Sequence, residues 1–123
     1  MKTQSAKAKG RRLQQWVRDQ ILESFPSLTD ADVSSTSMGA GGMDVQLSTI
    51  ARKLFPYAVE CKNTEKVNIW NAWNQAEANC PEGMQPMLIV KRNGSFPLAI
   101  LDAEHFLEVS PSIKGIENGV HQQ

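Results

Sequence analysis

The fold is decided by the stretch GMDVQLSTIARKLFPYAVECK, residues 42–62. Residues 43–47 alternate between apolar and polar side chains, which predicts a strand. Ser48 can cap a short helix over residues 50–54, because its hydroxyl can accept a backbone N–H of the first turn. A proline ends that helix, and residues 57–62 predict a second strand. The stretch therefore predicts strand, short helix, strand.

Three chemically active side chains lie at the ends of these two strands. Asp44 opens the first strand, and Glu60 and Lys62 lie near the end of the second. Because alternate residues of a strand point to the same face, Glu60 and Lys62 project together, while Val59 and Cys61 face the core. We therefore expect two carboxylates and one ammonium group to converge at one edge of the sheet.

Two carboxylates and a lysine suit the hydrolysis of a phosphodiester. Carboxylate oxygens are hard ligands for Mg²⁺ or Mn²⁺. The metal acidifies a water and stabilises charge on a phosphoryl oxygen. A neighbouring lysine orients the water or stabilises the developing negative charge. Without further support, a Glu-x-Lys pair is equally typical of a solvated strand face.

Apolar periodicity places the remaining elements. In chain order they are a helix over residues 10–25, a strand over 33–37, a helix capped by Asn63 or Thr64 and ending near Asn79, a strand over 87–90, a hairpin turn at Asn93-Gly94, a strand over 96–101 and a short helix capped by Asp102. A helix between two strands indicates a parallel crossover. We expect an α/β fold, a small mixed sheet flanked by helices.

The chain organisation predicted from composition is a single domain. The 123 residues suffice for one domain, which we place at residues 10–109. Residues 1–9 are polar and basic and are expected to form a flexible arm. Residues 110–123 are polar and contain glycine, which predicts a disordered tail.

Charge is distributed unevenly along the chain. The 13 basic and 13 acidic residues give a formal net charge of zero. Residues 1–18 carry six basic side chains and no acid, so the remaining residues sum to −6. A basic arm on an acidic body indicates a polyanionic partner such as nucleic acid, although a solvated tail has the same composition.

Several classes of protein are excluded by composition. The sequence contains no apolar run of the roughly 20 residues that a membrane span needs, so we expect no membrane partner. Its basic N-terminus is not followed by an apolar stretch, unlike a secretory signal. Two cysteines, Cys61 and Cys80, are too few for a disulfide scaffold or a four-cysteine zinc site. We therefore expect a reduced, cytoplasmic protein.

This pattern resembles the signature of the PD-(D/E)xK nuclease superfamily, which is an acid, a variable spacer and then acid-x-Lys on the next strand. Asp44 matches the first acid, and Glu60 and Lys62 match the acid-x-Lys pair. Within this superfamily, the chain resembles small phage and archaeal Holliday-junction resolvases over roughly residues 9–108. Gly10-Arg11-Arg12 at the first helix, the Ser34–Ser37 segment and Gln75-Ala76-Glu77 in the later helix agree with this resemblance. It implies a restriction-endonuclease-like fold with an α-β-β-β-α-β-β core.

The resemblance also implies roles for single residues. Asp44 and Glu60 would bind Mg²⁺ or Mn²⁺, aided by the backbone carbonyl of Cys61. Lys62 would position the attacking water. Gln75 would approach that water or the scissile phosphate, although a solvent-facing polar position is an equally good interpretation of this residue.

Two positions depart from the family pattern. Met43 stands where the superfamily name has proline. The first-helix acid that helps bind metal in many relatives has no match, and Gln14 occupies the corresponding position. An amide oxygen can bind a metal or a metal-bound water without adding charge, which leaves the number of metals open. Glu23 is a less suitable substitute.

Polar residues outside the catalytic trio are candidates for DNA contacts. Serines in such segments also commonly make turn hydrogen bonds. The candidates are Lys7, Lys9, Arg11, Arg12, Ser35, Ser37, Asn71, Lys91 and Arg92. Because resolvases cut two strands symmetrically, a two-fold homodimer is expected. Trp70 lies off the apolar stripe of its helix and is the candidate dimer contact.

Three functions remain open at this point. The first is a Mg²⁺-dependent, structure-selective endodeoxyribonuclease that resolves Holliday junctions in phage recombination or replication. The second is the same catalytic core acting on single-stranded, nicked or flap DNA. The third is a catalytically inactive, nuclease-like DNA-binding protein, which the missing first-helix acid favours.

Overall fold

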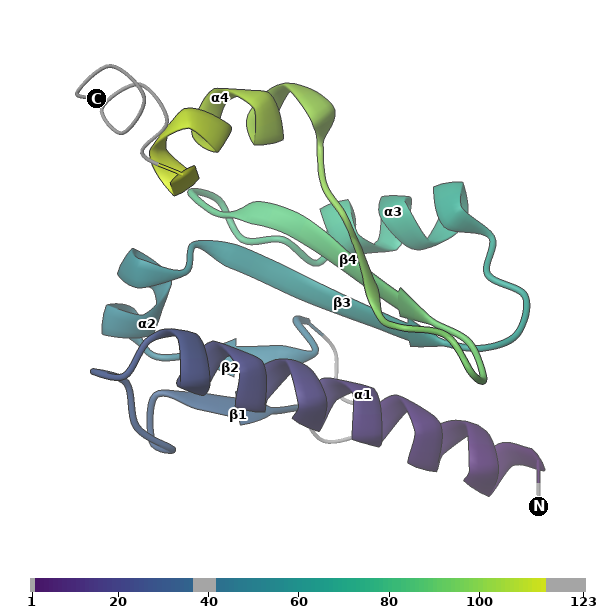
Figure 1. Cartoon of the computed structure of the whole chain (residues 1–123). Coiled ribbons are helices and arrows are strands. Elements are labelled where there is room, and N and C mark those ends of the chain that lie inside the picture. Colours follow the sequence, from purple (N-terminus) through teal and green to yellow (C-terminus); the bar gives the residue numbers. More distant parts are fainter. Residues whose placement is uncertain (1, 37–41, 115–123) are drawn as a thin grey trace.

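The computed structural model describes residues 2–36 and 42–114 (Figure 1). In chain order its elements are α1 (Lys2–Ser24), β1 (Val33–Ser35), β2 (Val45–Leu47), α2 (Thr49–Leu54), β3 (Tyr57–Asn63), α3 (Ile69–Ala78), β4 (Gln85–Lys91), β5 (Leu98–Ile100) and α4 (Ala103–Lys114). β1 and β2 form an antiparallel pair. β3 and β4 run parallel, and β5 is antiparallel to β4. The described chain is therefore a small α/β protein with four helices and two small sheets.

The strands form two sheets. The predicted small mixed sheet flanked by helices is the three-stranded β3–β4–β5 sheet, whereas β1 and β2 form a separate antiparallel pair. Within the described residues, one backbone hydrogen bond links β3 to the start of β2, from the Asp44 N–H to the Val59 carbonyl at 3.0 Å. At the next position a side chain replaces the backbone, because the Cys61 N–H donates to the Asp44 carboxylate at 2.7 Å. Backbone pairing between the two sheets therefore stops at Asp44.

Helices cover both faces of the three-stranded sheet (Figure 1). α1 packs on β1 and β3, where its buried stripe of Leu13, Val17 and Ile21 joins the core that includes Val59 and Cys61. α3 packs on the other face, against β3 and β4. The β3–α3–β4 unit is the parallel crossover predicted from the sequence. In the described part of the chain, no helix combines the length and apolar character needed to cross a membrane.

The terminal helices are longer than predicted. α1 begins at Lys2, so residues 2–9 are helical and are not a flexible arm. These residues are mostly good helix formers, and Gly10 inside the helix costs only about 1 kcal/mol. α4 continues to Lys114, so residues 110–114 are helical rather than part of a disordered tail. Residues 115–123 lie outside the described residues.

The start of α3 also differs from the prediction. Asn68 caps this helix by accepting the Asn71 N–H at 3.0 Å. Asn63 cannot cap it, because Asn63 belongs to β3 and its side-chain amide donates to the Lys9 carbonyl at 3.0 Å. Two other predicted caps are confirmed, since Ser48 caps α2 at 3.1 Å and Asp102 accepts the His105 N–H at 2.9 Å.

The remaining strand boundaries shift by a few residues. β3 and β4 are longer than predicted, whereas β1, β2 and β5 are three residues each. The hairpin between β4 and β5 turns at Asn93-Gly94 as expected, and Gly94 has a φ of +76°, which favours glycine.

Candidate functional site

Asp44 is fixed at the gap between the two sheets. Its backbone N–H donates to the Val59 carbonyl, and its carboxylate accepts the Cys61 N–H at 2.7 Å. Both bonds go to the same edge of β3. The Asp44 carboxylate therefore lies against the backbone of β3, one residue from Glu60.

Glu60 and Lys62 lie on one face of β3, as their spacing predicts. The Glu60 side chain is buried, with 4% of the residue exposed. Lys62 Nζ lies 3.6 Å from one Glu60 carboxylate oxygen. The other oxygen accepts a hydrogen bond from Asn79 Nδ2 at 3.4 Å. The structure thus brings the predicted trio together and adds Asn79, the residue that caps the end of α3.

The two carboxylates share a poorly solvated environment. Burial raises the pKa of Glu60 above its ordinary value, and the nearby Asp44 charge raises it further. Burial also raises the pKa of Asp44, although the Cys61 N–H and the Lys62 charge oppose that change. Each shift means that the ionised carboxylate is disfavoured there. A divalent cation between the two carboxylates would offset this cost.

Cys61 contributes its backbone rather than its thiol. Burial raises the pKa of the thiol, so the sulfur stays protonated and faces the core. The N–H and C=O of one strand residue point to the same side of the strand. Because the Cys61 N–H reaches Asp44, the Cys61 carbonyl also points to the side of Asp44. This is the carbonyl that the sequence resemblance implies as a metal ligand.

Gln14 lies level with this part of β3. α1 runs antiparallel to β3, because the Lys9 carbonyl contacts Asn63 and the Phe25 ring packs on Phe55, with ring centroids 6.1 Å apart. Five helical residues past Lys9 span about 7.5 Å, which equals about two residues of strand. That distance, measured back from Asn63, brings Gln14 level with Cys61 and its neighbour.

The Gln14 side chain has an unusual environment. The residue is 5% exposed, and its side-chain oxygen Oε1 has no hydrogen-bond partner within the described residues. Buried polar atoms are nearly always satisfied, so an orphaned oxygen marks a place for a further partner. Glu23, by contrast, is exposed near the end of α1.

The donors available to a metal are all oxygens. In residues 2–36 and 42–114, no three His, Cys, Asp or Glu side chains cluster. The site instead combines the Asp44 and Glu60 carboxylates with the Cys61 carbonyl, and Gln14 offers an unsatisfied amide oxygen at the same level of β3. Such a set fits a hard cation such as Mg²⁺ or Mn²⁺.

A small hollow of about 170 Å³ opens beside Lys62. Asn71 and Gln75 of α3 line it, and both are exposed. Helical spacing places four amide side chains along one stripe of this helix, those of Asn68, Asn71, Gln75 and Asn79. Asn68, Asn71 and Gln75 line the hollow next to Lys62, and Asn68 also caps the helix, whereas Asn79 lies outside the hollow and contacts Glu60.

The predicted DNA-binding residues occupy several places. Lys9, Arg12 and Lys91 line a groove of about 300 Å³ with Trp16, between α1 and the β4–β5 hairpin. Lys7, Arg11 and Arg92 are exposed, and Ser35 is half-buried in β1. Ser37 lies outside the described residues. Trp70, the candidate dimer contact, is 77% exposed.

Two residues near the site were not predicted as part of it. Asn79 contacts Glu60, and its place in the amide stripe at helical spacing from Gln75 was the available signal. Lys66 lines the hollow beside Lys62, and nothing in the sequence distinguishes it from other surface lysines. Comparison with protein-family models, curated proteins and solved structures finds no match to this chain.

Proposed function

We propose that this protein is a metal-dependent, structure-selective DNA endonuclease that hydrolyses phosphodiester bonds. One observation carries the proposal. The Asp44 carboxylate is bound to the Cys61 N–H at 2.7 Å, beside a buried Glu60 that pairs with Lys62 at 3.6 Å. A buried and a half-buried carboxylate, both with raised pKa values and next to a lysine, are costly for a purely structural role and are typical of functional sites.

The residues divide the work of the reaction. Asp44, Glu60 and the Cys61 carbonyl would hold Mg²⁺ or Mn²⁺, and Gln14 Oε1 would add an uncharged ligand or hold a water. The bound ion supplies Lewis acidity and lowers the pKa of water. Lys62 borders the adjacent hollow, where its ammonium group can orient the attacking water or donate to a phosphoryl oxygen.

The amides of α3 face the same hollow. Gln75 and Asn71 carry N–H₂ donors that can contact the oxygens of a phosphate placed beside Lys62. Contacts to phosphate carry no sequence information, so these amides can position a DNA backbone without selecting a sequence. This arrangement suits an enzyme that reads the shape of its DNA.

We further propose four-way junctions as the preferred DNA and a homodimer as the active species. Symmetric cleavage of two strands needs two sites related by a two-fold axis. The exposed Trp70 ring offers apolar surface for such a contact. Junction resolution would place the protein in phage recombination or replication, and nicked, flap or single-stranded DNA are the alternative substrates.

Cleavage assays with defined variants test this function. The wild-type chain is incubated with Mg²⁺ and a four-way junction, a flap, a duplex or a single strand. We expect paired symmetric cuts on the junction. The cleavage rate should fall by about 10²- to 10³-fold in Lys62→Ala, the size seen when a hydrogen-bond donor to the transition state is removed. Glu60→Gln should reduce cleavage to background while junction binding stays within about twofold.

Lys53→Ala is the matched control, because Lys53 is an exposed lysine on α2 away from the trio. Its cleavage should equal that of the wild type. Full activity in Lys62→Ala or Glu60→Gln would contradict the nuclease assignment. Cuts on the flap or the single strand, without cuts on the junction, would support the nuclease assignment and contradict junction resolution.

An inactive DNA-binding protein is the second candidate function. The uncharged Gln14, which replaces the first-helix acid, favours it. Junction binding without cleavage by the wild-type chain in Mg²⁺ and in Mn²⁺ would support this alternative.

A further inference from the structure

The sheet face that carries the catalytic lysine extends beyond α3. In the strand register Lys62 pairs with Val90, and Val90 pairs with Leu98. Paired residues project to the same face, so these three side chains form one row across the sheet. α3 begins only at Ile69, and Leu98 is 64% exposed. This end of the sheet is therefore left open.

Two hollows follow one another over this open end. The hollow beside Lys62 and a larger one of about 530 Å³ share Thr64, Lys66 and Val67 in their linings. The larger hollow continues to Phe96 and Arg92 at the β4–β5 hairpin. A continuous track therefore runs from the proposed catalytic site, across the β3–α3 loop, to the hairpin.

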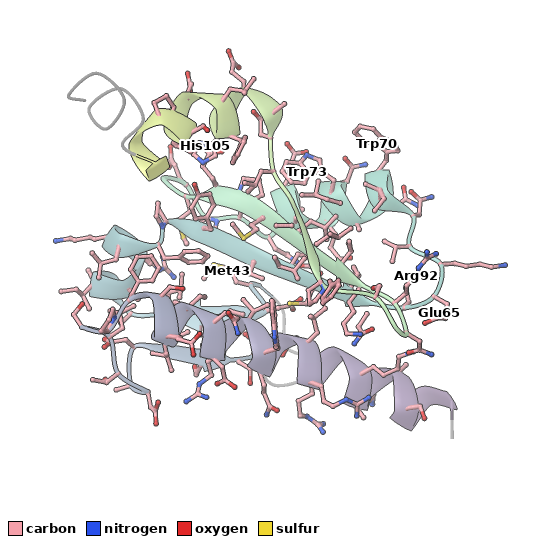
Figure 2. All side chains as sticks on the ribbon, in the orientation of Figure 1. Met43, Glu65, Trp70, Trp73, Arg92 and His105 are labelled. Atoms are coloured by element: carbon pink, nitrogen blue, oxygen red, sulfur yellow. The ribbon has the colours of Figure 1, made fainter. Side chains whose placement is uncertain are left out.

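The charge of the larger hollow suits an anion. It is lined by three cations, Lys66, Lys91 and Arg92, and by one acid, Glu65. Figure 2 shows Glu65 and Arg92 together at this end of the molecule. The Glu65 carboxylate is already engaged, since it accepts the Asn93 N–H at 2.7 Å and lies 3.7 Å from Lys9 Nζ.

Phe96 adds an aromatic platform to this cationic hollow. Its residue is 87% exposed, the highest value among the exposed large hydrophobic residues of the described chain. An aromatic ring next to cations is the combination that binds unpaired nucleotides, because the ring stacks on a base while the cations hold the phosphate. The volume lies within the range of about 300–1,000 Å³ for ligand pockets.

We propose that this hollow binds an unpaired nucleotide of branched DNA next to the scissile phosphate. Its base stacks on Phe96, and its phosphate lies between Lys66 and Arg92. The inference rests on the proposed nuclease function, because it takes the Lys62 end of the track as the place of cleavage. The hollow would select DNA with unpaired bases over continuous duplex.

Binding measurements without divalent metal separate this inference from catalysis. The full chain is titrated in EDTA with two DNAs. The first is a branched duplex with two unpaired nucleotides at the branch, one of which is 2-aminopurine. The second is the fully paired duplex. We expect Phe96→Leu to bind the branched DNA about tenfold more weakly, which lies within the range for the loss of one stacked base. Binding to the paired duplex should stay within about twofold.

Two further variants complete the design. Phe96→Trp keeps an aromatic face. It should therefore keep the affinity for branched DNA and the quenching of 2-aminopurine fluorescence on binding. Phe106→Leu makes the same change at an exposed ring on α4 that lines neither hollow, and should match the wild type on both DNAs. Sedimentation of Phe96→Leu shows whether the ring instead holds two copies of the chain together.

The inference is overturned by unchanged branched binding in Phe96→Leu, by an equal loss on both DNAs, by no DNA binding in the wild type, or by a changed oligomeric state in Phe96→Leu. A selective loss of branched binding in a chain that cuts no DNA would retain the nucleotide site and reject only the nuclease function. If the wild type cuts DNA but Phe96→Leu loses no selectivity for branched DNA, the nuclease function is retained and the nucleotide site is rejected.

Discussion

Gln14 is the residue at which stability and function conflict most directly. Its buried side-chain oxygen has no partner in the described residues. A buried unsatisfied polar group costs about 1–3 kcal/mol. Under the proposed function, this oxygen is available as a ligand for the metal or for a metal-bound water.

We therefore predict opposite effects of Gln14→Leu on stability and activity. The free energy of unfolding should rise by about 1 kcal/mol, because the orphaned oxygen is removed at similar volume. Cleavage at limiting Mg²⁺ should fall. Gln15→Leu, the same change at the exposed neighbouring position, should lower neither activity nor stability appreciably. A destabilised but fully active Gln14→Leu protein would show that the side chain is only a packing element.

The burial of Glu60 could not be predicted from the sequence. The alternation along the strand predicts that Glu60 and Lys62 share a face, and this is confirmed. Whether that face is solvated depends on α3, since Asn79 reaches back across nineteen positions to the carboxylate. Local periodicity contains no information about such a contact.

At the scale of elements, Asp32 joins the loop before β1 to α2. One carboxylate oxygen accepts the Ser48 hydroxyl at 2.8 Å, and the other accepts the Thr29 N–H at 2.9 Å. Ser48 is the N-cap of α2, so this helix is fixed at its start. The pKa of Asp32 is lowered, first by the Thr29 N–H and then by Ser48.

The sign of the pH dependence follows from that lowered pKa. A carboxyl with a depressed folded pKa stabilises the fold above its unfolded value, near 3.8, and this contribution is lost as pH falls through the folded pKa. Asp32→Asn should therefore lower the urea midpoint at pH 7, with little difference from wild type at pH 2. Asp30→Asn, at a neighbouring exposed carboxylate, should leave both midpoints nearly unchanged. A pH-independent effect of Asp32→Asn would contradict an electrostatic role.

The boundaries of elements were predicted less well than their order. The crossover β3–α3–β4 follows from a helical pattern between two apolar strands, and it is confirmed. The start of α3 was wrong because Asn63 is held in β3 by the Lys9 carbonyl, a contact with a distant helix. The mixed sheet is confirmed as β3–β4–β5. The separation of β1 and β2 from it was not predicted, because it depends on the Asp44 side chain, rather than a backbone group, accepting the Cys61 N–H.

At the scale of the whole molecule, the zero net charge divides between a basic α1 and an acidic remainder. The helical state of residues 2–9 changes how that charge is arranged, because the cations lie along a helix rather than on the flexible arm expected from the sequence. Lys9 and Arg12 line the groove beside the hairpin, whereas Lys7 and Arg11 are exposed one turn apart.

Salt dependence tests whether α1 contacts the DNA backbone. Each lost phosphate contact lowers the slope of log K against log salt by about 0.9. The double variant Lys7→Gln/Arg11→Gln should therefore reduce the slope by roughly 2 on duplex DNA. Arg52→Gln/Lys53→Gln, which removes the same charge from α2, should leave the slope unchanged. An equal reduction in both variants would indicate a general charge effect.

The most direct test of the central claim is the calorimetric titration of Mn²⁺ into the full chain. We expect saturable binding by the wild type, and equal binding by Glu77→Gln, whose carboxylate is exposed on α3. Asp44→Asn and Glu60→Gln should each remove the heat of Mn²⁺ binding, while their circular dichroism spectra stay the same as that of the wild type. Equal Mn²⁺ binding in all four proteins, or none in the wild type, would contradict a metal site built on Asp44 and Glu60.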